Sequence, residues 1–394
     1  MKNIIGSPVR GINFFERARE VERITNSLKN GNHIQITAPR RIGKTSILLH
    51  LLDNDIAGHH YVYVDTESIA DEQSFYQKLL MEVLKNDKIS RSQKLTAGFK
   101  NGANRFFERI KSVSLLNAGI AFNNEASTRD YCDEFEDFLT GYAGTEDAEL
   151  VILIDEFPQT IENIRKNSSE QSAIQFLQRK RALRLHPEIS KKVKFIYTGS
   201  IGLNQTVSVL GATATINDLN SIEVGPLNEK EAKNLFRRLL ENNERTVDAS
   251  AEECLQEILQ WYIPFHIQLL VQETVNITAN NELITAETVK KALNRIIDLR
   301  YQNHFDHYYT RLKTHFKDDN FKYADAVLKE IAEKNTVNKQ HLRELASKCM
   351  LTEYRHIIES LLYDGYIYQE DETRFYKFNS PILQRWWLKF ICES

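Results

Sequence analysis

One eight-residue segment joins residue types that bind phosphate groups: Ala38, Pro39, Arg40, Arg41, Ile42, Gly43, Lys44 and Thr45. An apolar run precedes it and a helical pattern follows it, which is the context that a phosphate-binding loop requires. In such a loop, the backbone N–H groups and the helix N-terminus point toward phosphate oxygens. Gly43 lets the backbone approach closely, and Lys44 is expected to contact the β- and γ-phosphates. The Thr45 hydroxyl is expected to bind Mg²⁺, and Ser46 continues the ATP-binding segment.

Two adjacent carboxylates, Asp155 and Glu156, follow the apolar residues 151–154. A buried strand that ends in two acids can deliver them to the edge of a sheet, close to the phosphate-binding loop. We expect Asp155 to hold the water shell of Mg²⁺ and Glu156 to act as the base that polarises an attacking water. Asp155, Glu156 and Lys44 are therefore the predicted catalytic residues.

A third polar segment, Thr198-Gly199-Ser200, ends the apolar run 193–198. Its hydroxyls could reach the γ-phosphate between the two acids, so either Thr198 or Ser200 is the predicted sensor of the phosphate. A plain turn at the end of a strand is the alternative interpretation.

The spacing of apolar residues indicates how these motifs are positioned. Short runs rich in Val, Ile and Tyr alternate with helical patterns such as 46–52 and 74–84, which is typical of an α/β fold with a parallel sheet covered on both faces. We predict five strands, at 33–37, 61–65, 150–155, 193–198 and 221–224. They define a nucleotide-binding core over residues 1–227, with an insertion at about 85–130.

The pattern changes twice beyond the core. Residues 228–299 show only amphipathic helices, which predicts an all-helical lid with helices at 229–240, 251–260, 267–276 and 286–297. Residues 300–394 then show a linker helix, three short helices and two β-like runs. That order is typical of a winged helix, with residues 352–362 in the recognition-helix position and the acidic residues 370–372 in the wing.

Length and composition bound the class of protein. A chain of 394 residues exceeds one ordinary core, so two or three domains are expected. Apolar residues make up 42% and charged residues 27%, as in soluble globular proteins, and no apolar run is as long as a membrane span. The N-terminus lacks the apolar core of a signal peptide, and the four cysteines lack metal-ligand spacing. We therefore expect a cytoplasmic protein without membrane association.

Charge is distributed unevenly along the chain. Residues 85–111 hold eight basic and two acidic residues, whereas residues 124–149 hold nine acidic residues and one basic residue. Two solvated faces that partly neutralise each other are one interpretation, and a basic surface for a nucleic acid or a protein is the other. Residues 320–394 carry eleven residues of each sign. We expect this balanced region to dock on the lid or on a protein partner rather than on DNA.

With these motifs placed, the chain resembles the AAA+ superfamily, and within it the STAND-like branch of archaeal-type ATPases. Residues 7–11 and 14–20 are similar to the opening segment of that family, which lies against adenine. The resemblance implies that Val9 and Arg10 belong to the ATP site. It also implies that Pro264, in a segment similar to the lid motif, packs on the base.

The resemblance further implies binding and slow hydrolysis of ATP to ADP with Mg²⁺, by a lid and a winged helix that respond to the nucleotide. In AAA+ assemblies, an arginine near the sensor strand can reach the γ-phosphate of a neighbouring subunit. Residues 165–194 hold nine basic and two acidic residues, and Arg181 and Arg184 are the candidates for such an arginine finger. A solvated helix face is the alternative interpretation.

The sequence leaves three functions open. The leading hypothesis is a cytoplasmic ATPase switch that couples its nucleotide state to a protein partner or to self-association. One alternative is a DNA-binding, initiator-like or regulatory ATPase. The other is a scaffold that uses ATP as a structural cofactor.

Overall fold

A computed structural model describes residues 1–54, 56–86, 89, 130–143, 148–298 and 304–393. The chain forms two compact units, which we call the sheet unit (16–37 and 44–223) and the helical unit (1–15, 38–43 and 224–394). The helical unit contains both the predicted lid and the predicted winged-helix region, and the division into three domains stays a prediction. The predicted insertion and the basic residues 85–111 fall almost entirely outside the described residues.

Parallel strands form the centre of the sheet unit: β1 (His33–Thr37), β2 (His60–Asp65), β3 (Leu150–Asp155), β4 (Val193–Tyr197) and β5 (Leu219–Glu223). Their order in the sheet is β2-β3-β4-β1-β5. All residues of β3 are buried, as is expected of a strand with neighbours on both sides and helices on both faces. The predicted α/β class and five-stranded parallel sheet are confirmed, and the strand ends differ from the predicted ends by at most two residues.

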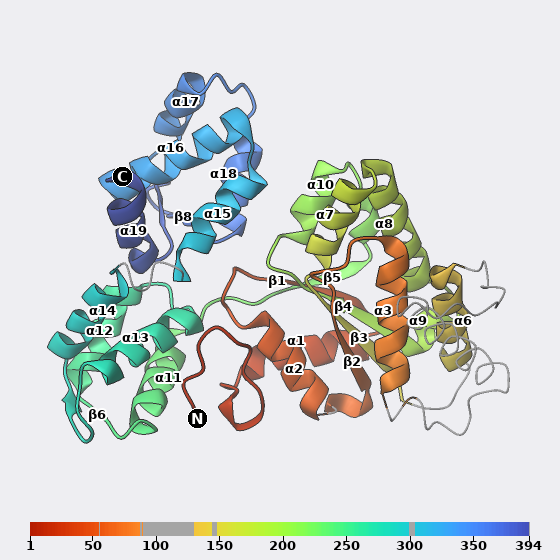
Figure 1. Ribbon diagram of the computed structural model, residues 1–394, viewed down its shortest axis with the longest axis horizontal. Helices are drawn as coiled ribbons and strands as arrows, with labels where there is room; N and C mark the ends of the chain where they lie inside the picture. Colours follow the sequence, from red (N-terminus) through yellow and green to blue (C-terminus); the bar gives the residue numbers. More distant parts are fainter. Residues whose placement is uncertain (55, 87–88, 90–129, 144–147, 299–303, 394) are drawn as a thin grey trace, which may run out of the picture. The chain divides into compact units, whose positions relative to one another are not determined.

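Helices cover both faces of this sheet (Figure 1). On one side lie α1 (Ala18–Lys29) and α2 (Lys44–Asn54), and on the other lie α7 (Phe157–Asn167), α8 (Glu170–Leu185) and α10 (Leu203–Val209). The sheet unit also contains α3 (Glu72–Lys85), α6 (Tyr131–Ala143), α9 (Ile189–Lys192) and the 3-10 turns η2 (Ile56–Gly58) and η3 (Thr213–Ile216). Side-chain caps fix some of these starts: Asp71 caps α3 and Ser169 caps α8.

The core of the sheet unit encloses a buried cation. Lys180, on α8, is fully buried, and its Nζ has no hydrogen-bond partner among the described residues. Aromatic rings surround the amine, and the closest ring centroids are those of Phe195 at 4.5 Å and Phe75 at 5.1 Å. Burial, with a smaller effect of Arg184, lowers the pKa of Lys180 to about 7, whereas the ring faces favour the charged form.

We predict that Lys180→Met stabilises the protein at pH 7, by roughly 4 kcal/mol if burial dominates over the ring contacts. The folded pKa lies below that of the unfolded chain, so Lys180 destabilises the fold fully below pH 7, and this effect fades as the pH rises toward 10.5. Urea unfolding at several pH values would show the gain shrinking above pH 7. The exposed Lys166 provides the control, Lys166→Met. A loss of stability in Lys180→Met at every pH would mean that the rings hold a charged amine.

In the helical unit, the predicted lid contains α11 (Glu229–Glu241), α12 (Ala249–Leu259), α13 (Pro264–Asn276) and α14 (Ala286–Ile296), and η1 (Gly11–Asn13) lies near the N-terminus of the chain. A capping box between Asn228 and Glu231 starts α11. The lid is not wholly helical, because β6 (Thr246–Val247) and β7 (Leu283–Ile284) form a short parallel pair. Two residues are too few to produce an alternating pattern, so these strands leave no signal in the sequence.

The C-terminal part begins with α15 (Asp306–His315) and α16 (Asp318–Lys334). It continues with α17 (Lys339–Lys348), α18 (Arg355–Tyr363), the hairpin β8 (Ile367–Gln369) and β9 (Tyr376–Phe378), α19 (Pro381–Trp387) and the π-helical turn Leu388–Cys392. After the linker helix, the order is helix, helix, helix and hairpin, which is the predicted order. Trp386 and Trp387 are buried among Phe305, Tyr366 and Phe378, so their rings pack in the core.

The cysteines are free thiols at separate places. Cys132 and Cys254 are buried, whereas Cys349 and Cys392 are half-buried. Within the described ranges, no helix is both long and apolar enough to cross a bilayer.

Candidate functional site

The loop between β1 and α2 contains two residues with positive φ, Arg41 at 66° and Gly43 at 100°. Alternation of left-handed and right-handed residues turns successive backbone N–H groups toward one side, which creates a concave anion site. A Cβ at position 43 would meet no atom within 4 Å, so the backbone angle, and not crowding, favours glycine there. The helix that follows begins at Lys44, which places this lysine at the helix N-terminus, where anions are favoured.

Thr45 and Asp155 meet as the sequence predicts. The Thr45 hydroxyl donates to Asp155 Oδ2 over 2.7 Å, and the Tyr63 hydroxyl donates to the same oxygen over 3.1 Å. Asp155 is 3% exposed, and burial raises the pKa of its carboxyl group although the bond from Thr45 lowers it. A bound cation would offset this desolvation, so the paired oxygens of Thr45 and Asp155 fit Mg²⁺.

Magnesium needs few protein ligands, because phosphates and waters complete its octahedral shell. The described residues contain no group of three or more His, Cys, Asp and Glu side chains arranged to hold a metal. The arrangement therefore fits a metal that arrives together with a phosphate ligand.

Glu156 adopts a left-handed backbone conformation, with φ 55°, at the start of α7. Its Oε2 accepts one hydrogen bond from the Ser200 N–H over 2.8 Å and another from the Ser200 hydroxyl over 2.9 Å. A non-glycine residue in this region stores strain and persists only where its surroundings hold it. The contact with Ser200 is one such restraint, and it fixes the direction of the carboxylate.

Gly199 makes this contact possible. A Cβ at position 199 would lie 2.5 Å from Pro158 Cδ, in the first turn of α7. The turn after β4 can therefore approach α7 closely only with glycine at this position, and the approach brings Ser200 to Glu156. Thr198 lies in a different environment. It is 2% exposed, and its hydroxyl has no hydrogen-bond partner within the described part of the chain. Of the two predicted sensors, Ser200 bonds directly to Glu156, whereas the backbone of Thr198 bonds to Ile154 and Phe157, which flank the acid pair.

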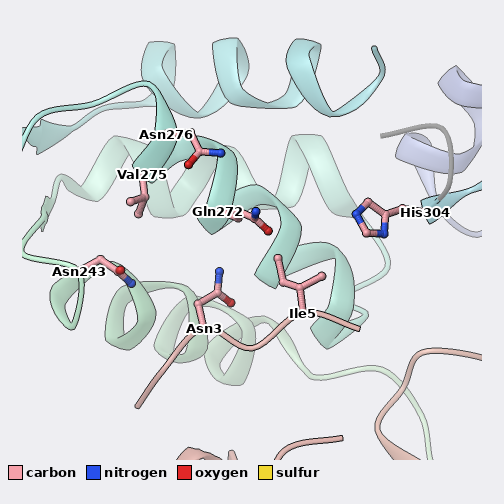
Figure 2. Close-up of a pocket in the computed structure, with 7 residues that line it drawn as sticks. All are labelled: Asn3, Ile5, Asn243, Gln272, Val275, Asn276 and His304. Carbon is pink, nitrogen blue, oxygen red and sulfur yellow. The ribbon is translucent and has the colours of Figure 1, made fainter. Parts of the chain in front are cut away.

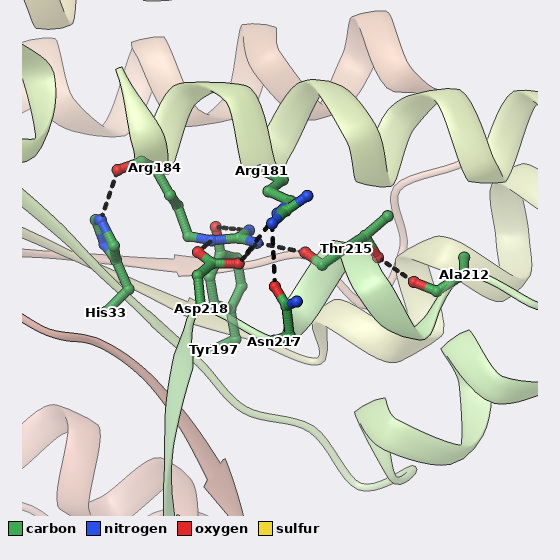
Figure 3. A network of polar contacts seen from close by, with 8 residues as sticks. All are labelled: His33, Arg181, Arg184, Tyr197, Ala212, Thr215, Asn217 and Asp218. Carbon is green, nitrogen blue, oxygen red and sulfur yellow. Dashed lines mark hydrogen bonds and ion pairs between the residues drawn. The ribbon is translucent and has the colours of Figure 1, made fainter. Parts of the chain in front are cut away.

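The two predicted finger residues lie in different environments (Figure 3). Arg184 is 2% exposed and forms two bonds with Asp218, Nε to Oδ2 over 2.7 Å and Nη2 to Oδ1 over 2.9 Å. It also donates to the Tyr197 hydroxyl over 3.4 Å and to the Thr215 carbonyl over 2.5 Å. Arg184 is thus held by its partners inside the sheet unit, and its candidate role as an arginine finger stays a prediction. Arg181 is 38% exposed and donates to Asn217 over 3.2 Å, so it stays a candidate.

We predict that Arg184→Ala destabilises the fold by about 3 to 5 kcal/mol, because Asp218 would lose both of its close bonds and keep, among the described residues, only the ion pair with Arg181 at 3.8 Å. Arg181→Ala, as the matched variant on the same helix, should cost less than about 1 kcal/mol. Urea unfolding of both variants measures the difference. An Arg184→Ala protein of normal stability that had lost ATP hydrolysis would support the finger role.

The residues implied to lie near adenine all belong to the helical unit. Val9 and Arg10 directly precede η1, and Pro264 is the first residue of α13. The Arg41 guanidinium carbon lies 4.2 Å from the ring centroid of Phe265, the residue after Pro264. The loop tip and the start of α13 are therefore neighbours within this unit, while contact of Val9 and Arg10 with a base stays a prediction.

A separate pocket of about 530 Å³ lies in the helical unit (Figure 2). Its lining comes from the N-terminal segment, the residues just after α11, the second half of α13 and a histidine: Asn3, Ile5, Asn243, Gln272, Val275, Asn276 and His304. Burial lowers the pKa of His304, which favours its neutral form. The pocket contains none of the predicted site residues and no acidic or permanently charged side chain, so it lacks the groups that hold a triphosphate.

Sequence reasoning missed two features of the site: Tyr63 looked like an ordinary strand residue, and Gly199 looked like a turn residue. Ser200 was predicted as one of two equal choices. The signal that could have found Tyr63 is its position near the end of the strand that neighbours β3, since parallel strands end at the same edge of a sheet.

The fold and these contacts define a P-loop ATPase. Residues 14–270 match a family described as an ATPase domain predominantly from Archaea, and the chain belongs to this family. The resemblance to archaeal-type ATPases is therefore confirmed. No curated protein matches the chain.

Two solved structures show the same fold. The Walker-type ATPase of Pyrococcus abyssi is 17% identical, with 98% of this chain and 99% of that chain covered and a TM-score of 0.62. The ORC2 protein of Aeropyrum pernix, in its ADPNP–ADP complexes, is 12% identical, with 98% and 94% covered and a TM-score of 0.56.

Proposed function

We propose that this protein is a cytoplasmic, STAND-like ATPase switch. It binds ATP with Mg²⁺, hydrolyses it slowly to ADP, and couples the change to a protein partner or a second copy through its lid and its winged helix. The observation that carries the proposal is the arrangement at the ends of β3 and β4, where Asp155 meets Thr45 and Glu156 meets Ser200.

Each residue has a distinct part in this proposal. The loop N–H groups and Lys44 bind the phosphates, and Thr45 and Asp155 hold Mg²⁺, which neutralises phosphate charge when bound. Glu156 accepts the proton of the attacking water. Both bonds from Ser200 go to Oε2, so Oε1 is left for this water.

The charged side chains of the C-terminal part support a protein partner over DNA. Arg355 of α18 pairs with Glu359 over 2.7 Å, and Lys377 of the hairpin pairs with Glu370 over 2.7 Å. Three lysines of α16 also have acidic partners within 3 Å, namely Lys322, Lys329 and Lys334. DNA affinity depends on cations that can neutralise phosphates, and here the neighbouring acids compete for them.

We predict that Lys44→Ala abolishes ATP binding, whereas Glu156→Gln retains binding and loses most hydrolysis. The side-chain amide of the second variant keeps an oxygen that can accept from Ser200, but the amide cannot take the proton from water. Isothermal titration with ATP and a phosphate-release assay separate the two effects. Normal ATP affinity in a folded Lys44→Ala protein would overturn the site, and normal turnover in Glu156→Gln would place the base elsewhere.

We predict that the full-length protein shows no measurable binding to duplex DNA at physiological salt, and that DNA does not stimulate its ATPase activity. Fluorescence anisotropy with labelled duplex, repeated at several salt concentrations, makes the measurement. Micromolar binding that weakens steeply with salt would favour the DNA-binding alternative. If such binding were lost in Arg355→Ala but kept in the exposed-lysine control Lys166→Met, the predicted recognition helix would be the contact.

A further inference from the structure

The tip of the phosphate-binding loop, Pro39–Arg41, packs on the lid within the helical unit. The Arg41 guanidinium stacks on Phe265, which is 4% exposed and lies in the first turn of α13. The Nε of Arg41 is buried and has no hydrogen-bond partner in the described part of the chain. Among the described residues, Arg41 is therefore held by ring stacking rather than by an acid.

The same tip also contacts the C-terminal part through a glycine. Gly365 lies between α18 and β8 with φ +76°. A Cβ at this position would lie 2.4 Å from Trp261 Cη2 and 3.1 Å from Pro39 Cβ. Gly365, Trp261 and Pro39 are thus in close contact, and there is no room for even one more carbon atom. Three distant segments of the chain meet here: the loop, the turn between α12 and α13, and the start of the hairpin.

The charge of Arg41 affects two histidines, the buried His266 of α13 and the half-buried His307 of α15. Burial is the main cause that lowers the pKa of His266 to about 3 and that of His307 to about 2, and Arg41 contributes to both. Both rings are thus neutral. The position of the loop tip therefore depends on packing.

We propose that the contacts of Pro39 with Gly365 and of Arg41 with Phe265 form a latch that pre-organises the phosphate-binding loop. Arg41 has a left-handed backbone, which a non-glycine residue adopts only when its surroundings enforce it. The latch supplies this enforcement. With the latch closed, the N–H groups of the loop converge on phosphate, and when the C-terminal part moves away, the loop relaxes and nucleotide affinity falls.

The latch rests on the proposed function, because it links the nucleotide affinity of the switch to the position of the C-terminal part. Because coupling is reciprocal, bound nucleotide strengthens the packing of Gly365 on the loop by the same factor by which the latch strengthens nucleotide binding. A partner that pulls the C-terminal part from Pro39 would therefore release the nucleotide.

Gly365→Ala tests the latch in the full-length protein, with Gly58→Ala as the matched control. Both glycines have nearly the same positive φ, +76° and +73°, but a Cβ at position 58 would meet no atom within 4 Å. Gly365→Ala is expected to raise the Kd for ATP and ADP about tenfold, which corresponds to about 1.4 kcal/mol, and to speed the release of a fluorescent ADP. Gly58→Ala leaves both unchanged. If Gly365→Ala has the same melting temperature as Gly58→Ala and binds nucleotide with wild-type affinity, the latch does not exist.

A second set of variants, made in an Arg41→Gly background, separates an effect on the position of the loop from a general loss of stability. In Arg41→Gly, residue 41 reaches a positive φ without support, so adding Gly365→Ala should change nucleotide affinity by less than about twofold. An undiminished effect in that background would overturn the latch. Should Gly365→Ala fail to fold, Phe265→Leu removes the ring but keeps an apolar side chain, and it is expected to weaken binding in the same direction.

The outcomes distinguish the latch from the proposed function. If the wild-type protein binds no nucleotide, the proposed function fails. If the wild type binds ATP and Lys44→Ala does not, while Gly365→Ala and Phe265→Leu bind normally, the function stands and the latch fails.

Discussion

The rest of the sheet unit is organised around the carboxylate of Asp155, which lies almost fully buried at the end of β3. Asp155 can stay buried only because Thr45 and Tyr63 donate to it. Its backbone carbonyl also accepts from the N–H and the hydroxyl of Thr66, which fixes the end of β2 beside it. The chain then leaves the strand through the left-handed turn at Glu156. The carboxylate and the backbone of Asp155 thereby join the start of α2, the end of β2 and the turn that leads to Glu156.

The other half of the sheet is fastened by a neutral histidine and a charged arginine, both of which are buried. His33 accepts from the Phe195 N–H at Nδ1 and lies within hydrogen-bond distance of the Arg184 carbonyl at Nε2, so its donor is on Nε2. Burial lowers its pKa to about 4, in agreement with a neutral ring. These bonds join β1, β4 and α8. Arg184, paired with Asp218, adds the segment before β5. The network holds β1 in place, and β1 delivers the phosphate-binding loop.

The features that could be predicted from the sequence are those that depend on local pattern. Five short apolar runs and the residues after them identified the sheet, the loop at Lys44 and the acids at Asp155 and Glu156. The remaining features depend on contacts between distant residues. Nothing in a run of arginines distinguishes Arg184, which faces Asp218, from the exposed Arg181. The sequence also does not tell whether a glycine is required by its backbone angle or by crowding. Position 43 requires glycine for its positive φ, whereas position 199 requires it because Pro158 leaves no space for a Cβ.

Two non-glycine residues with left-handed backbones, Arg41 and Glu156, flank the motifs of the site. Such residues hold their conformation only against a restoring strain, so each depends on whatever packs against it. Glu156 is restrained inside the sheet unit by Ser200, next to the groups that would perform hydrolysis. Arg41 belongs by its contacts to the helical unit, where Phe265 restrains it. Glu156 is thus restrained by a contact within the sheet unit, whereas the restraint on Arg41 comes from a contact within the helical unit. The proposed latch would therefore act on Arg41, while the bond between Glu156 and Ser200 lies wholly within the sheet unit.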